Sequence, residues 1–155
     1  MSDAFIPVRI VGIMPAGSGM AVFLGNEEKT FSLHVDHGIG MAIAILLKGE
    51  KRERPLTHDL IGLIFLAFGI TVERILINDL RNDTYFARIV LKAENEIHKK
   101  ITEIDARPSD CLAIALQAEK PILVARSVWD QVTDIGPILQ DLKKENEEND
   151  EPPLS

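Results

Sequence analysis

The chain has 155 residues and a formal net charge of −7, and 46% of its residues are hydrophobic. This length suits one domain with a sizeable core. No stretch approaches the roughly 20 consecutive apolar residues of a membrane span, so we expect no membrane partner. The first residues, MSDAFIPVRIVG, lack the pattern of a secretory signal, which predicts a cytoplasmic location. Cys111 is the only cysteine, which excludes an intramolecular disulfide and a multi-cysteine zinc site.

The negative charge gathers at the C-terminus. Residues 141–155 hold six acids and two lysines, which leaves a net charge of only −3 on the rest of the chain. We therefore expect one folded domain over residues 1–135 and an acidic tail over residues 136–155, with about the last ten residues disordered. Binding of nucleic acid regardless of its sequence normally needs a basic face, and the totals offer none.

Hydrophobic patterning predicts that the first half of the chain folds as three strands followed by two helices. The expected elements are strands at about Ile6–Met14, Met20–Gly25 and Thr30–Val35, an apolar helix over Ile39–Leu47 that ends at Gly49, and a helix in HDLIGLIFLAF. For the second helix we expect Thr57 as N-cap, Asp59 in the first turn and Gly69 at the end.

The second half repeats this order. Strands are predicted in TVERILIND, TYFARIVLKA and IHKKITEIDA, followed by a helix in PSDCLAIALQAE, a short strand in PILVAR and a helical turn in SVWDQV. The segment HVDHGIGMAIAIL, from His34, aligns without gaps to DARPSDCLAIALQ, from Asp105. This indicates an internally duplicated α+β fold of two strand-strand-strand-helix units, a mostly antiparallel sheet with packed helices.

The segment from Asp105 to Asp110 allows two interpretations. The first copy has His34, Asp36 and Ile39 where the second has Asp105, Arg107 and Asp110, so the corner folds without the second copy's charges. These charges can form a reaction centre. They can equally be helix-start chemistry, with Pro108 in the first turn, Ser109 or Asp110 as a cap and Arg107 paired with a neighbouring carboxylate.

Three further polar groups have weaker patterns. Thr57, His58 and Asp59 stand at a helix start after a basic link, where a histidine can move protons and free N–H groups can hold a phosphate, but a cap and a solvent-exposed histidine explain them equally well. The segment NDLRNDTYFA reads as a polar hairpin turn. The HVDH segment offers metal-type side chains, but its spacing on a strand end favours a surface cluster.

Four ordered motifs carry a resemblance to a known family. RPLTHDLI, NDLRNDTYFARIVL, DARPSDCLAIAL and PILVA together resemble the bifunctional nuclease domain family, over about Phe5 to Val132. The family occurs in bacteria and in plants, where members are similar to wound-responsive proteins with both DNase and RNase activity. The family's recurring polar residues correspond here to Arg54, Thr57, His58, Asp59, Asp79, Tyr85, Asp105, Arg107, Ser109 and Asp110. One departure is Ile39, which stands where the family commonly has an acid.

The resemblance implies a nuclease that hydrolyses phosphodiester bonds of DNA and RNA. In the expected mechanism Asp59, Asp105 and Asp110 hold a divalent cation, Mg²⁺ or Mn²⁺, which activates a water. His58 moves a proton and Arg107 neutralises charge on the phosphoryl group. The residues expected to bind substrate are Arg54, Thr57, Tyr85 and Ser109.

The rival hypothesis is a non-catalytic ligand-binding or scaffold module that forms a homo-oligomer, in which the same polar motifs are caps and ion pairs. The net acidity favours it. Both hypotheses include a dimer or higher homo-oligomer, because the helices at Ile39–Leu47 and Cys111–Leu116 are apolar on nearly every side. Such helices are buried either by a second helix layer or by a partner subunit.

Overall fold

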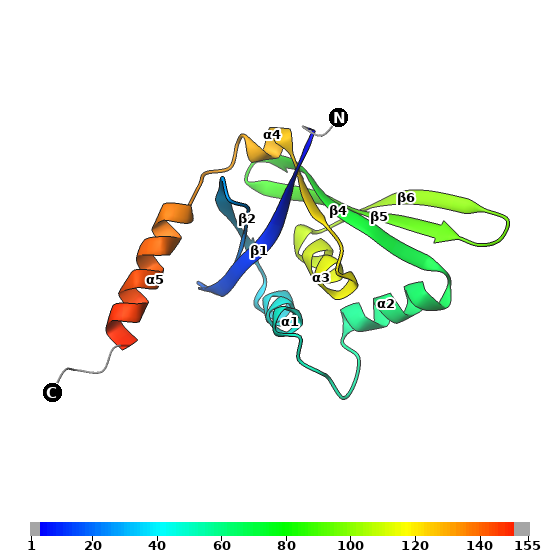
Figure 1. Cartoon of the computed structure of the whole chain (residues 1–155), viewed down its shortest axis with the longest axis horizontal. Helices are drawn as coiled ribbons and strands as arrows, with labels where there is room; N and C mark the ends of the chain where they lie inside the picture. The colour runs from blue at the N-terminus through cyan, green and yellow to red at the C-terminus, as the bar shows by residue number, and fades with distance from the viewer. Residues whose placement is uncertain (1–3, 151–155) are drawn as a thin grey trace.

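A computed structural model describes residues 4–150 of the chain and shows one sheet with helices packed on it (Figure 1). In chain order the elements are β1 (Phe5–Ala16), β2 (Gly19–Gly25), β3 (Thr30–Val35), α1 (His37–Lys48), α2 (Thr57–Ala67), β4 (Ile70–Arg81), β5 (Thr84–Glu94), β6 (Lys99–Ala106), α3 (Pro108–Ala118), β7 (Ile122–Ala125), α4 (Arg126–Trp129) and α5 (Gly136–Asp150). The predicted α+β class and the predicted order of strands and helices are confirmed.

The seven strands form one sheet in the order β3-β2-β1-β7-β4-β5-β6. Each set of three strands is an antiparallel meander, and β7 lies between them, antiparallel to β1 and parallel to β4. The two meanders therefore occupy opposite halves of the sheet, as expected for two copies of one unit.

The two strand-to-helix corners have the same local structure. β3 ends at Val35 and β6 ends at Ala106, which are aligned positions. The next residue in each copy is the helix N-cap, Asp36 with φ −62° and ψ 150° and Arg107 with φ −64° and ψ 143°. Because strand end, cap and helix start coincide in the ungapped alignment, the duplication predicted from sequence holds at the backbone level.

Helix α3 lies at the centre of the molecule. Its residues from Cys111 to Ala115 are all buried, and it packs against α1, α2, β4 and β5. The all-round apolarity of this helix is therefore satisfied by a second helix layer within the chain. Helix α1 is less covered, because Met41 and Leu47 are exposed on it.

The β4–β5 connection is the tight turn that its sequence predicts. Asn82 and Asp83 have φ values of 48° and 62°, the left-handed conformation that asparagine and aspartate tolerate best among residues with a β-carbon. Two consecutive residues of this kind match the right-handed twist of a two-stranded hairpin. The interpretation of NDLRND as a polar hairpin turn is thus correct for these two residues.

The start of α2 differs from its prediction. Thr57 is the first helical residue and not the N-cap, and the N-cap is Leu56. The Leu56 backbone N–H donates to Asp59 Oδ2 at 2.9 Å. A carboxylate in the first turn thus accepts a hydrogen bond from the residue just before the helix. This bond differs from the one expected of a threonine N-cap, whose hydroxyl would accept from an N–H group inside the first turn.

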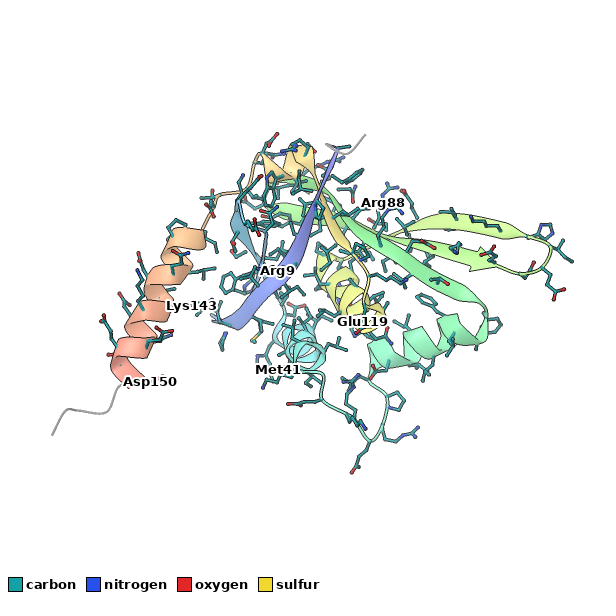
Figure 2. All side chains as sticks on the ribbon, viewed as in Figure 1. Arg9, Met41, Arg88, Glu119, Lys143 and Asp150 are labelled. Atoms are coloured by element: carbon teal, nitrogen blue, oxygen red, sulfur yellow. The ribbon has the colours of Figure 1, made fainter. Side chains whose placement is uncertain are left out.

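The first part of the acidic tail is a helix. Helix α5 continues to Asp150, where disorder was expected from about residue 146, and residues 151–155 lie outside the described part. Glutamate, lysine, glutamine and leucine are good helix formers, which explains a helix without a core to pack on. No residue of α5 is buried, and Figure 2 shows its side chains, including Lys143 and Asp150, spread around a helix that stands away from the sheet. Within residues 4–150 no helix is long and apolar enough to cross a membrane.

Candidate functional site

Helix α3 begins with an ion pair of its own. Pro108 occupies the first helical position, where a missing N–H costs nothing, and Arg107 precedes it in extended conformation. The Arg107 guanidinium donates from Nε to Asp110 Oδ2 at 2.9 Å and from Nη2 to Asp110 Oδ1 at 3.3 Å. Asp110 is thereby fixed at the positive end of the α3 dipole.

Helix α2 brings a histidine to the same place. His58 lies in the first turn of α2, with only 12% of its side chain exposed. Its Nε2 lies 3.4 Å from Asp110 Oδ1. The two corners that the predicted mechanism needed to meet, Thr57–Asp59 and Asp105–Asp110, therefore converge through His58 and Asp110.

The first copy contributes to the same cluster. Arg107 Nη1 lies 3.7 Å from Asp36 Oδ2, and Asp36 is the N-cap of α1. Asp36, His58, Arg107 and Asp110, here called the corner cluster, thus connect the N-termini of α1, α2 and α3. Each helix start carries a partial positive charge of about half an elementary charge, which favours an anion at this point.

The electrostatics of the corner cluster keep Asp110 and Arg107 charged. Partial burial alone would raise the pKa of Asp110, but the Arg107 hydrogen bonds and charge, together with His58, outweigh it, so the pKa is lowered. The same pairing, chiefly the hydrogen bond to Asp110, raises the pKa of Arg107 above its usual value. The Arg107 side chain is 63% exposed, so its outer edge stays accessible to a ligand.

Asp59 has a different set of partners from Asp110. Arg52 donates from Nε to Asp59 Oδ2 at 2.7 Å and also from Nη2 to Oδ1, and Arg52 Nη1 donates to the Glu50 carbonyl at 2.9 Å. The hydrogen bond from Arg52 is the main reason that the pKa of Asp59 is lowered. This arrangement ties the link between α1 and α2 to the first turn of α2, so Asp59 acts here as a local clasp.

The remaining predicted residues surround the corner cluster in different ways. Arg54 and Thr57 are exposed beside the start of α2, and Ser109 is buried in the first turn of α3. Asp105 is exposed at the end of β6, opposite Arg88 in the β5–β6 register. These four lie on segments that flank the corner.

Tyr85 and Asp79 lie in the β4–β5 hairpin. The Tyr85 ring stacks on Phe31 with ring centroids 6.0 Å apart, and burial raises the pKa of its hydroxyl. Asp79 accepts a hydrogen bond from Arg81 Nε at 2.6 Å. Both side chains thus have structural partners near the turn.

The predicted metal site needs three carboxylates in one place. In residues 4–150 no group of three or more His, Cys, Asp or Glu side chains is arranged to hold a metal ion. The donor set of Asp59, Asp105 and Asp110 does not fit a three-ligand site in this conformation, since Asp59 is engaged by Arg52. A divalent cation therefore stays a prediction, and no chemical step below depends on it.

Sequence reasoning missed two residues that the structure brings into play. Arg52 lies in the charged link EKRERP, where three basic residues in sequence give no sign of which one folds back onto Asp59. Asp36 was predicted as part of HVDH and as the aligned counterpart of Arg107, but not as its partner. The alignment held a usable signal, because Asp36 and Arg107 are the same corner position with opposite charges.

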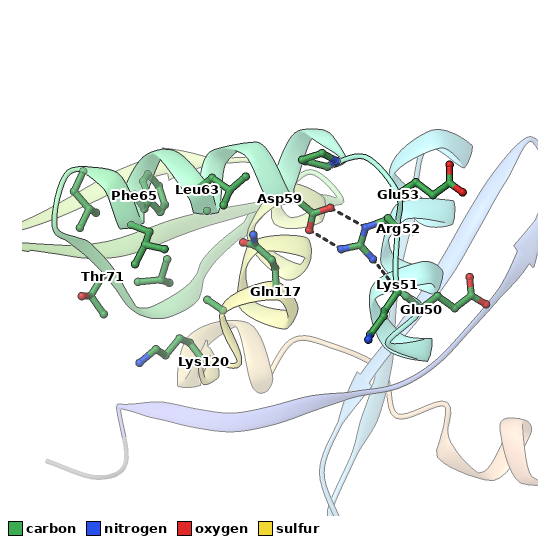
Figure 3. Close-up of a pocket in the computed structure, with 16 residues that line it drawn as sticks. Glu50, Lys51, Arg52, Glu53, Asp59, Leu63, Phe65, Thr71, Gln117 and Lys120 are labelled. Atoms are coloured by element: carbon green, nitrogen blue, oxygen red, sulfur yellow. Dashed lines mark hydrogen bonds and ion pairs between the residues drawn. The ribbon is translucent and has the colours of Figure 1, made fainter.

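A pocket of about 820 Å³ opens beside the corner, between α2, the end of α3 and the start of β4 (Figure 3). Leu63, Phe65 and Val72 give it an apolar wall, and Lys51 and Lys120 lie on its polar side. In Figure 3 the Arg52–Asp59 ion pair closes one end of the pocket, and Gln117 lies beneath α2. Its volume falls within the range of small-molecule sites.

A family model and two bacterial relatives match most of this chain. The family model described as the bifunctional nuclease domain matches residues 22–135. Two Mycobacterium tuberculosis proteins, the uncharacterized protein Rv1829 of strain H37Rv and the uncharacterized protein MT1877 of strain CDC 1551, are each 32% identical to this chain over 128 residues. That alignment covers 80% of this chain and 74% of either relative. The family match includes both strand-to-helix corners and all of α2.

Proposed function

Because the chain belongs to the bifunctional nuclease domain family, we propose that it hydrolyses phosphodiester bonds of DNA and RNA at the corner cluster. The observation that supports this most is the contact of His58 with Asp110, beside Arg107, where three helix N-termini converge. A proton-transfer residue, a carboxylate that orients it and a cation for a phosphate are the parts that such a hydrolysis requires.

Phosphate binding is assigned to Arg107. Its inner edge is held by Asp110, and the exposed outer edge can donate to a phosphate oxygen. The N-termini of α1 and α3 add favourable potential for an anion. Helix α5, with five acidic residues and two lysines, carries −3 of the net charge of −7 and stands apart from the sheet at the left edge of Figure 1.

Proton transfer is assigned to His58. If Nε2 carries the proton and donates a hydrogen bond to Asp110, Nδ1 is left to accept a proton from the attacking water. The water oxygen then bonds to phosphorus while the bond to the leaving oxygen breaks, and His58 returns the proton to that oxygen. Asp110 holds the ring and stabilises the imidazolium that forms between the two steps.

The test is a fluorogenic assay on highly purified full-length protein with quenched single-stranded DNA and RNA, each in Mg²⁺, Mn²⁺ or chelator. His58→Ala is expected to lose about 10²- to 10⁴-fold in kcat/KM, the usual contribution of general acid–base catalysis. Asp110→Asn is expected to lose at least about tenfold, because the ring loses its charged partner. Dependence on either cation tests the predicted metal.

Matched controls separate this result from contamination or unfolding. His98→Ala, in the β5–β6 turn, and Asp141→Asn, on α5, make the same chemical changes away from the corner cluster and are expected to keep full activity. Equal residual activity in the wild type, His58→Ala and Asp110→Asn would mean a contaminating nuclease and would remove the proposed activity.

A non-catalytic ligand-binding module is the second candidate, and the pocket beside α2 favours it. An apolar wall with two lysines on its polar side suits a ligand with an apolar body and an anionic group. The apolar anion anilinonaphthalene sulfonate is a suitable probe. Bound-state fluorescence that Lys120→Glu abolishes, in protein that cleaves neither substrate under any metal condition, would favour this function over the nuclease.

A further inference from the structure

Helix α2 presents apolar side chains to solvent along its outer face. Leu60, Leu63, Ile64 and Leu66 are 52%, 51%, 46% and 79% exposed, and Phe68, which caps the helix, is 77% exposed. No residue of α2 is fully buried. A helix at the surface of a soluble domain normally carries polar residues on this face, so α2 has the pattern of a helix that is covered on both sides.

The inner side of the same helix is already in use. Ile61 and Phe65, one turn apart, pack against the hydrophobic core, and His58 contacts Asp110. Leu60, Leu63 and Ile64 have the three- and four-residue spacing that places side chains on one stripe of a helix. Leu63 and Leu66 also line the open pocket beside α2, so this stripe runs from the rim of the pocket to the outside of the helix. The exposed residues are therefore a second apolar face.

The size of this face is close to what an interface needs. The exposed fractions of the five side chains correspond to roughly 600 Å², at the upper limit of the largest apolar patch on a typical monomer. A standard protein–protein interface buries about 800 Å² on each partner. The five side chains therefore supply about three quarters of that value.

We propose that the outer face of α2, formed by Leu60, Leu63, Ile64, Leu66 and Phe68, is the interface between two copies of this chain. The five side chains carry no charge, so no like charges on this face would repel a second copy of it. Two-fold homodimers bury the same patch on both subunits. The acidic helix α5 stands at the left edge of Figure 1, apart from α2, so it does not belong to this face.

The two-fold symmetry makes a specific geometric statement. In an antiparallel pair of identical helices, the residue at the centre of the contact meets its own copy. Leu63 is the middle of the stripe from Leu60 to Leu66, so Leu63 of one copy faces Leu63 of the other. The corner cluster stays outside the contact, because His58 is on the inner side of α2, and the interface is therefore independent of the proposed nuclease activity.

The first test measures mass in solution. Sedimentation equilibrium of the full chain at about 50 μM is expected to give twice the chain mass of 17.2 kDa. Leu63→Glu is expected to weaken dimerisation by at least 100-fold and to give the single mass, because it places two like charges at the two-fold axis. Ile138→Glu, at a side chain that is 60% exposed on α5, is the matched control and is expected to remain a dimer.

The second test fixes the geometry by cross-linking. Cys111 is fully buried, so in Leu63→Cys the introduced thiol is the reactive one. Mild oxidation is expected to give a disulfide-linked dimer with Leu63→Cys and none with Ile138→Cys. A wild-type protein that is monomeric at 50 μM would overturn the proposal, and so would a dimer that Leu63→Glu leaves intact while Leu63→Cys fails to cross-link. The nuclease activity of Leu63→Glu is measured in parallel. Failure of the dimer proposal and failure of the nuclease proposal at the corner cluster are then seen in separate experiments.

Discussion

Replacing Asp59 by alanine removes three hydrogen bonds at once. Two come from the Arg52 guanidinium and one comes from the Leu56 backbone N–H, and 18% of the Asp59 side chain is exposed. Loss of a capping hydrogen bond costs about 1 kcal/mol. A partly exposed ion pair adds up to about 1 kcal/mol, so Asp59→Ala is expected to lower the free energy of unfolding by about 2 kcal/mol. For a chain of this size that corresponds to a fall in Tm of roughly 4–8 °C.

Urea unfolding followed by circular dichroism measures this difference, and its pH dependence identifies the cause. The folded-state pKa of Asp59 is lowered, so the ionised carboxylate contributes stability above its unfolded pKa of about 3.9. That contribution is lost as pH falls through the folded-state pKa. The difference between the wild type and Asp59→Ala is therefore expected to be constant from about pH 7 to pH 5 and to shrink below about pH 4.

The same variant shows whether Asp59 has a structural role, in which it ties the link to α2, or a role in the reaction. If Asp59 holds the link to α2, Arg52→Ala loses only the ion-pair part, up to about 1 kcal/mol, while Asp59→Ala loses about 2 kcal/mol, and the double variant loses less than their sum. Asp141→Ala, on α5, is the matched control with no expected change. Wild-type stability in Asp59→Ala together with a large loss of nuclease activity would refute the clasp and return Asp59 to the predicted metal site.

Two further predictions concern the core. Gly40→Ala is expected to lower the free energy of unfolding by about 1–3 kcal/mol in urea titration, because the added Cβ would collide with Met20, whereas Gly38→Ala on the same helix meets open space and is expected to raise it by up to about 1 kcal/mol. Burial raises the pKa of the Cys111 thiol to about 12, so a colorimetric thiol reagent at pH 8 is expected to react with it only after denaturant is added. Rapid reaction of the native protein would contradict the burial of Cys111.

The sequence predicted the elements well, because each has a local signal. Strand alternation and turn residues placed all seven strands, and Gly49 ends α1 with the left-handed φ of 66° that a C-cap glycine adopts. The alignment of the two copies also predicted that the strand-to-helix corners after β3 and β6 have the same backbone structure. One error is also local: the N-cap of α2 is Leu56 and not Thr57, and Asp59 accepts a hydrogen bond from the Leu56 N–H.

The site could be predicted only as two separate halves. His58 and Asp110 are 52 residues apart in sequence, and their contact depends on how α2 packs on α3, which no local pattern encodes. The same limit applies to Arg52, since its choice of Asp59 depends on the path of the link after Gly49. Long-range contacts of this kind follow from packing of whole elements, and the sequence supplies only the candidate side chains.

The duplication explains where the corner cluster arises. Each copy provides one strand-to-helix corner, and the two N-cap residues, Asp36 and Arg107, approach each other because α1 and α3 pack together. The second copy adds Asp110, where the first has the half-buried Ile39. Helix α2 follows only the first copy, since α3 leads directly into β7, and it brings His58 to the second copy's corner alone. A symmetric scaffold thus acquires one chemically distinct corner, because the element that supplies the histidine occurs once.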